Sequence, residues 1–187
     1  MIAITGKSGA GKTYYSTKLR KLGYKVFIGD EFNNIIYSFN NEGYNLVKNH
    51  ISGTLVNEKG VDKPKLVAWI LEDFKNNLEK LKNLIEPLHF EHLKKNKYDF
   101  AELALITKES NFRDLFLEII FLNISENKRK KNLIEKRKIS LEQYLNINKK
   151  IADHSEGKHF FNIKFEIDSV KEEDVLNYLI NKSKNSN

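Results

Sequence analysis

Cysteine is absent from this 187-residue chain, and several kinds of chemistry are absent with it. Without cysteine there is no disulfide, no thiolate metal site and no cysteine nucleophile. The sequence also lacks any apolar run near the roughly eighteen residues that a membrane-spanning helix needs. Met1–Thr5 is too short for a secretory signal and leads directly into glycines and Lys7. We therefore expect a cytoplasmic protein that does not associate with membranes.

Acidic residues are too few to balance the basic ones. The chain has 25 Asp and Glu against 32 Lys and Arg, which gives a formal net charge of +7. Such a surplus favours anionic partners, either nucleic acid or phosphorylated small molecules. The basic residues are spread along the chain, with one denser cluster at 128–138. This dispersed charge fits a phosphate-handling enzyme at least as well as a nucleic-acid binder.

Short apolar segments alternate with helical patterns along the chain, whose length suits one domain. The patterns predict strands at 1–5, 24–28, 98–106, 115–124 and 159–167, and helices at 12–22, 31–39, 64 onward, 126–137, 140–151 and 170–182. Of the only two prolines, Pro64 suits a helix start, whereas Pro87 is expected to kink or interrupt the long helix. Alternating strands and helices indicate an α/β fold with a parallel sheet wrapped by helices. The ligand should then lie beyond the carboxyl ends of the strands, where residues 5–6, 29–30 and 107–108 would meet.

The most informative motif is a phosphate-binding loop, or P-loop, near the amino terminus. The segment fits the pattern G-x-x-x-x-G-K-[ST] and consists of Gly6, Lys7, Ser8, Gly9, Ala10, Gly11, Lys12 and Thr13. Its glycines let the backbone curl so that N–H groups point at phosphate oxygens. Lys12 would reach the β- and γ-phosphates, and the Thr13 hydroxyl would bind Mg²⁺. A glycine-rich turn without function is the alternative, but the predicted strand before the motif and helix after it argue against this. We therefore predict a P-loop NTPase-type, three-layer fold that uses ATP and Mg²⁺, in which Gly6, Ser8, Gly9, Ala10, Gly11, Lys12 and Thr13 bind the nucleotide.

Two acidic residues lie where the predicted sheet would meet its ligand. Asp30 follows the second predicted strand, where it could orient or deprotonate an acceptor hydroxyl, bind magnesium through water, or cap the helix at 31–39. Glu102 lies inside the third predicted strand, and a buried acid there needs a partner. It could position magnesium through water near the P-loop, or simply face the crevice. We predict Asp30 as catalytic and as substrate-binding, and Glu102 as substrate-binding.

The basic cluster at 128–138 is the candidate lid over the transferring phosphoryl group. One face of a predicted helix carries Arg129 together with Lys136 and Arg137, which lie seven and eight positions after it. Positive charge on this face could stabilise the transition state, as kinase lids do. The alternatives are a solvated basic helix or a nucleic-acid patch. We predict Arg137 as catalytic and Arg129 as substrate-binding. Aromatic residues do not interleave the charges, which makes nucleic acid an unexpected partner.

Two histidines stand three positions apart on the long predicted helix. His89 and His92 could in principle hold a metal ion, but no third ligand lies near them in the sequence. Both are therefore interpreted as surface residues.

With these residues identified, the chain resembles the dephospho-coenzyme A kinases. The likeness includes Ile2 to Thr13, Leu22-Gly23-Tyr24-Lys25-Val26, Asp30, Gly60-Val61-Asp62-Lys63 with Leu66 and Phe74, Leu84 to Leu88, and Glu102 to Ile106. It implies that Asp30 is the catalytic Asp of the family and that Asp62 binds the acceptor. It also implies a single domain with its core at 1–39, 97–125 and 157–187, a helical acceptor-binding region at 40–96 and a lid at 126–151.

The acceptor side departs from the family pattern at four places. Ile28 replaces an Asp, Asn34 a basic residue, Glu86 a His and Ala104 a Pro, whereas the P-loop is intact. The resemblance implies that the chain phosphorylates the ribose 3′-hydroxyl of dephospho-coenzyme A with ATP. Other functions fit the same P-loop: a nucleoside or nucleotide kinase, or an ATPase that binds nucleic acid or a protein through the basic cluster.

Overall fold

The computed structural model describes residues 1–184 and divides them into two compact units. The first contains Met1–Ile28 and the chain from Asn96 onward, and the second contains Gly29–Lys95. The end of the predicted core segment 157–187, namely 185–187, lies outside the described residues. Among the helices that are described, none is both long and apolar enough to cross a membrane.

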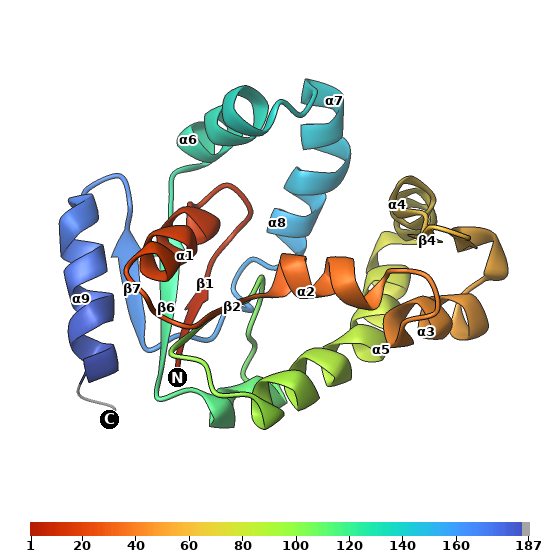
Figure 1. Ribbon diagram of the computed structural model, residues 1–187. Coiled ribbons are helices and arrows are strands. Elements are labelled where there is room, and N and C mark those ends of the chain that lie inside the picture. The colour runs from red at the N-terminus through yellow and green to blue at the C-terminus, as the bar shows by residue number, and fades with distance from the viewer. Residues whose placement is uncertain (185–187) are drawn as a thin grey trace. The chain divides into compact units, whose positions relative to one another are not determined.

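The first unit contains a five-stranded parallel sheet in the order β2-β5-β1-β6-β7 (Figure 1). The strands are β1 (Ile2–Thr5), β2 (Val26–Ile28), β5 (Phe100–Glu102), β6 (Glu118–Asn123) and β7 (Ile163–Glu166). All four residues of β1 are buried, since a central parallel strand is covered on both faces and reads as a continuous apolar run. The predicted α/β fold with a parallel sheet is confirmed.

Two helices cover one face of this sheet. Leu19 of α1 (Lys12–Lys21) and Leu179 of α9 (Glu172–Lys184) are fully buried in one core with Ile4 of β1 and Leu122 of β6. Helix α1 ends where Gly23 adopts a positive φ of 91°, and the Gly23 N–H donates to the Arg20 carbonyl at 3.0 Å. This left-handed glycine is a common helix stop. The packing fixes α1, and with it the P-loop that precedes α1, against the sheet.

Strand β5, the third strand of the parallel sheet in chain order, is shorter than its apolar pattern predicts. Strand β5 ends at Glu102, whereas the pattern extends the strand to residue 106. The chain leaves the sheet after Leu103, whose N–H still donates to the Ile4 carbonyl at 3.1 Å. Glu102 is therefore the carboxyl-terminal residue of β5 rather than an interior one. Thr107 and Lys108 lie beyond the strand and do not mark its end.

The predicted lid consists of two helical stretches. The first joins α6 (Glu126–Lys131) to a wider turn, η3 (Asn132–Lys136), and the second joins α7 (Leu141–Gln143), η4 (Tyr144–Lys149) and α8 (Lys150–His154). Between them Lys138 has a φ of 55°, which non-glycine residues seldom adopt. Ser140 begins the second stretch with a reciprocal capping box, in which Ser140 and Gln143 bond each other's backbone N–H. Both predicted helices are confirmed.

The second unit is helical, with one small hairpin. It contains α2 (Gly29–Ile36), α3 (Glu42–His50), the short turn η1 (Gly53–Leu55), the hairpin β3 (Val56–Asn57) and β4 (Gly60–Val61), α4 (Lys63–Glu72) and α5 (Phe74–Lys95). Val47, Leu55 and Leu66 form its buried core. The unit begins at Gly29, whereas the resemblance begins the helical region at residue 40. Helix α2 belongs with it because Asn33 bonds His89 of α5.

The expected interruption at Pro87 is wrong. Helix α5 runs through Pro87 to Lys95, and the break falls earlier, at Asp73 between α4 and α5. Asp73 has φ −140° and ψ 79°, and its carbonyl accepts from the Asn77 N–H at 2.8 Å. The Asn76 side chain also donates to the Asp73 carboxylate at 2.8 Å. These bonds start a new helix, and Pro87, which lacks a backbone N–H and so removes one internal hydrogen bond, does not end it.

Candidate active site

The P-loop backbone requires glycine at three positions. Gly6, Gly9 and Gly11 have φ angles of 147°, 88° and 94°, in the left-handed half that other residues rarely adopt. A Cβ atom on Gly6 would lie 2.5 Å from the Leu122 carbonyl oxygen of β6. A Cβ on Gly9 would lie 3.0 Å from Leu133 of the lid. The loop is thus curled tightly, with no room for a side chain at Gly6 and little at Gly9, whereas Gly11 is required by its backbone angle alone.

Lys12 reaches back across the loop that precedes it. Its ammonium donates to the Gly6 carbonyl at 2.6 Å and to the Lys7 carbonyl at 3.2 Å. The Ala10 N–H also donates to the Lys7 carbonyl, at 3.1 Å, and closes the turn. The charged end of Lys12 therefore lies inside the curl of the P-loop, where the sequence predicts the phosphates.

Thr13 and Glu102 are brought together by the sheet. The Thr13 hydroxyl donates to Oε1 of Glu102 at 2.9 Å, and Glu102 is only 5% exposed. The strand register places Glu102 beside Ile4, just before the P-loop. A hydroxyl and a carboxylate are oxygen ligands of the kind that Mg²⁺ prefers, so this pair fits a magnesium site. Thr13 is thus a partner for one of the two carboxylate oxygens of the buried Glu102.

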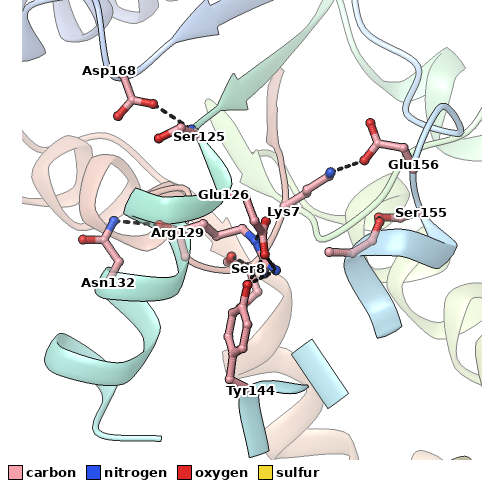
Figure 2. A network of polar contacts seen from close by, with 12 residues as sticks. Lys7, Ser8, Ser125, Glu126, Arg129, Asn132, Tyr144, Ser155, Glu156 and Asp168 are labelled. Atoms are coloured by element: carbon pink, nitrogen blue, oxygen red, sulfur yellow. Dashed lines mark hydrogen bonds and ion pairs between the residues drawn. The ribbon is translucent and has the colours of Figure 1, made fainter. Parts of the chain in front are cut away.

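Arg129 joins the lid to the P-loop (Figure 2). Its guanidinium donates to both carboxylate oxygens of Glu126, at 2.7 and 2.8 Å, and to the Ser8 carbonyl at 3.4 Å. It also donates to the hydroxyl of Tyr144 at 3.3 Å, and that hydroxyl bonds Glu126 in turn. Asn132, one turn after Arg129, donates to the Gly9 carbonyl at 3.0 Å. Nothing in the sequence marks Glu126, Asn132 and Tyr144 as members of the site.

The charges in this cluster stabilise one another. Arg129 is 1% exposed, and burial alone would lower its pKa. The hydrogen bond to Glu126 and the charge of Glu126 outweigh burial, so the pKa of Arg129 is raised. The same hydrogen bond lowers the pKa of Glu126. Burial, followed by the bond to Glu126, raises the pKa of Tyr144. A buried guanidinium needs such a partner, since an unpaired charge inside a protein is costly.

Arg137 differs from Arg129 in its surroundings. It is exposed at the end of the first lid stretch, and its side chain makes no hydrogen bond or ion pair within residues 1–184. Other members of the basic cluster are partly neutralised: Lys128 pairs with Asp168 at 3.0 Å, and Lys131 with Glu135 at 4.0 Å. The cluster therefore does not present one continuous positive face.

Asp30 and Asp62 lie in the second unit. Asp30 is the second residue of α2 and is exposed, and its carboxylate accepts no hydrogen bond from the described chain. It therefore makes no bond of the helix-capping kind. Asp62 does cap a helix, because its carboxylate accepts from the Lys65 N–H at 3.1 Å at the start of α4. Pro64 lies in this first turn of α4, as predicted.

Two of the departures from the family pattern have basic neighbours in the second unit. Glu86 pairs with Lys82 one turn earlier on α5, at 3.5 Å, and burial raises the pKa of Glu86. Asn34 accepts a hydrogen bond from the ammonium of Lys63. A basic group thus lies beside the position where the family pattern has a basic residue.

The expected surface position of His89 is wrong. His89 is 8% exposed, its Nε2 lies 2.8 Å from Oδ1 of Asn33, and Phe32 meets the ring edge-on at 5.1 Å. Burial lowers the pKa of His89 to about 4, although the nearby charge of Asp30 acts in the opposite direction. Within residues 1–184, no group of three or more His, Asp or Glu side chains is placed to hold a metal ion.

His159 is a residue that the sequence does not reveal. Its ring lies tilted against that of Phe121 of β6, with the ring centres 4.6 Å apart, and both ring nitrogens are buried without a hydrogen-bond partner in the described chain. Burial lowers its pKa to about 4, with Lys12 and Lys7 of the P-loop as further causes. A neutral histidine therefore lies within electrostatic range of the P-loop. No local pattern around residue 159 could have indicated this.

A five-stranded parallel sheet, a P-loop after its central strand and a buried acid beside the P-loop threonine define the fold of the P-loop kinases. The family model for dephospho-CoA kinase (CoaE) matches residues 1–168. The chain belongs to the dephospho-CoA kinase family, as its sequence predicts. It is therefore a kinase, and ATP is the substrate that its family implies.

Individual relatives agree with this assignment. A dephospho-CoA kinase of Mycoplasma genitalium is 38% identical over 108 residues, which cover 57% of this chain and 54% of that protein, about half its length. A dephospho-CoA kinase of Streptococcus mutans is 26% identical over 151 residues, which cover 76% of each chain. The solved structure of a dephospho-CoA kinase from Campylobacter jejuni is similar in fold, with a TM-score of 0.52 and 20% identity over 98% of this chain and 94% of that one.

Proposed function

We propose that this chain transfers the terminal phosphoryl group of ATP to the ribose 3′-hydroxyl of dephospho-coenzyme A. The observation that carries the proposal is the family match, which spans both the P-loop and the helical unit with its altered acceptor positions. The products are coenzyme A and ADP. A bond forms between the acceptor oxygen and the γ-phosphorus, and the bond from that phosphorus to the β,γ-bridging oxygen breaks.

The P-loop holds the phosphates of ATP. Its N–H groups line the curl made by Gly6, Gly9 and Gly11, and Lys12 provides a positive charge inside it. Phosphoryl transfer of this kind requires little covalent chemistry from the protein. Catalysis therefore depends on aligning the attacking and leaving oxygens with the phosphorus and on neutralising charge. Lys12 neutralises charge that accumulates as the terminal phosphoryl group leaves.

Magnesium is expected with ATP in this family, and two residues suit it. Thr13 would hold the ion through its hydroxyl, and Glu102 would act on it through water. The ion, when bound, neutralises charge on the phosphate oxygens. The hydrogen bond from Thr13 to Glu102 keeps the hydroxyl oriented at the carboxyl end of β5.

The acceptor side uses the second unit and the lid. Asp30 orients the acceptor hydroxyl and takes its proton, and Asp62 contributes to the acceptor pocket through the start of α4. Arg137, which is exposed and makes no ion pair within residues 1–184, closes over the transferring group. Nucleic acid is not an expected partner, and a cytoplasmic location remains a prediction from the sequence.

The test is direct. Purified protein, magnesium ATP and dephospho-coenzyme A are incubated, and coenzyme A is measured by chromatography. Nucleosides and nucleotides serve as competing acceptors, and the Lys12→Ala variant serves as the background control. Coenzyme A should form only with the unaltered protein. Transfer to a nucleoside with no coenzyme A at high enzyme concentration would assign another acceptor, and hydrolysis without transfer would indicate a P-loop ATPase.

A further inference from the structure

The P-loop is held from outside as well as from within. Its N–H groups point inward when it binds phosphate, so some of its carbonyls must find donors on the outer side. Two of these donors come from the first lid stretch: Arg129 bonds the Ser8 carbonyl at 3.4 Å, and Asn132 bonds the Gly9 carbonyl at 3.0 Å. Gly9 packs so closely here that a Cβ would lie 3.2 Å from both Cγ and the carbonyl oxygen of Arg129.

Arg129 has little freedom to act elsewhere. It is 1% exposed, Glu126 binds it through both carboxylate oxygens, and the Tyr144 hydroxyl joins Arg129 and Glu126 from the second lid stretch (Figure 2). The ring of Tyr144 also lies 5.3 Å from the guanidinium carbon. Two-point binding of this kind fixes the orientation of a guanidinium as well as its charge. The direction in which Arg129 points at the P-loop is therefore set by Glu126 and Tyr144.

We propose that Glu126, Asn132 and Tyr144 are positioning residues that, through Arg129 and directly, keep the P-loop curled for triphosphate binding. In this arrangement the stretch from Glu126 to Asn132 is a fixed support for the P-loop. Arg129 acts on the nucleotide through the loop, and Arg137 is left as the lid cation that meets the transferring group. The inference rests on the proposed binding of ATP by the P-loop, and it does not depend on which acceptor is used.

The measurement is the affinity of the intact protein for triphosphates, without any acceptor. Calorimetry with magnesium ATP, and with magnesium tripolyphosphate as a probe that lacks the nucleoside, reports the P-loop alone. Asn132→Ala and Glu126→Gln should each weaken both affinities by about three- to tenfold, the scale of one lost hydrogen bond. Tyr144→Phe removes only a hydroxyl and should give a smaller loss in the same direction.

The controls lie in the same helical stretch. Asn127→Ala and Glu135→Gln repeat two of the substitutions at exposed residues that do not contact the P-loop, and they should leave triphosphate affinity unchanged. With saturating acceptor, Asn132→Ala should raise KM for ATP more than it lowers kcat. Unchanged triphosphate affinity in folded Asn132→Ala and Tyr144→Phe protein would overturn the proposal, whatever their melting temperatures.

The two proposals fail in different ways. If dephospho-coenzyme A is not the acceptor, the unaltered protein makes no coenzyme A but still binds tripolyphosphate, and the variants still bind it more weakly. If Glu126→Gln does not fold, Asn132→Ala and Tyr144→Phe carry the test, because Asn132 is only half-buried and the Phe ring fills the place of the Tyr ring.

Discussion

The Thr13 hydroxyl of the P-loop donates a 2.9 Å hydrogen bond to the buried carboxylate of Glu102. Thr13 lies in the first turn of α1, the helix after the central strand, and Glu102 ends the neighbouring strand, so the parallel sheet is what joins them. The pair places a hydroxyl oxygen and a negative charge together at the carboxyl edge, where α/β proteins bind their ligands. The effect of this contact on metal use can be measured.

Glu102→Gln should raise the magnesium concentration needed for half-maximal activity by about tenfold. The amide oxygen can still accept from Thr13, so the change removes the charge and keeps the shape. Activity is measured across a magnesium titration at saturating ATP. Thr13→Ser, which retains the hydroxyl, is the matched control and should change little. An unaltered magnesium dependence of the Gln variant would argue against a role of Glu102 at the metal.

Lys12→Ala should abolish measurable transfer, a loss of at least a hundredfold. The change removes the cation inside the P-loop, which is worth several kcal/mol when it acts on developing charge in a site closed to water. Steady-state assays and a thermal melt are compared with Lys21→Ala, which alters an exposed lysine near the end of α1. Near-normal turnover in folded Lys12→Ala protein would refute the assignment of the P-loop.

Asp30→Asn should lower kcat by roughly a hundredfold or more, the usual scale for a positioned base, while ATP affinity stays the same. The substitution keeps the size of the side chain and removes only the charge. Glu31→Gln, at the adjacent exposed position, should retain activity. If Asp30 matters only to helix α2, the variant will lose folding stability in step with activity.

Arg137→Ala should slow phosphoryl transfer by about a hundredfold and weaken ATP binding much less. The reason is that a lid cation acts mainly on the charge of the transition state. Lys136→Ala removes a neighbouring exposed charge and is the control. Equal rates for Arg137→Ala and the control would exclude Arg137 as the lid cation. If the unaltered protein instead binds RNA or DNA in a salt-dependent way and Arg137→Ala loses that binding, the result would favour a nucleic-acid surface.

Folding stability should fall as the pH drops from 6.5 toward 4. Burial lowers the pKa of His89 to about 4, below its ordinary value of 6.5, so in this range the unfolded chain binds more protons than the folded one. The resulting loss in the free energy of unfolding amounts to roughly 3 kcal/mol at most for His89, and it is absent above pH 6.5. Unfolding in urea is followed at several pH values. His89→Gln should flatten the slope, and His50→Gln, at an exposed position, should not.

The sequence by itself determined the P-loop, the parallel α/β fold and the family. These depend on residues close together in the chain: the glycines and Lys12 shape one loop, and the buried central strand β1 begins with three successive apolar residues. Helix starts were equally local, since Ser140 and Gln143 cap one another within four positions. Such features follow from backbone geometry and from neighbours a few residues apart, and both can be read from a single segment.

Only the tertiary structure decided which distant residues meet. Glu102 finds Thr13 because two parallel strands lie in register, and Arg129 is enclosed because Glu126, Tyr144 and the Ser8 carbonyl surround it. The buried position of His89 and the buried ring nitrogens of His159 depend on packing against Phe32 and Phe121, which no spacing along the chain encodes. Whether a charged or polar side chain faces water or a partner is settled by what packs against it, and that is a property of the assembled fold.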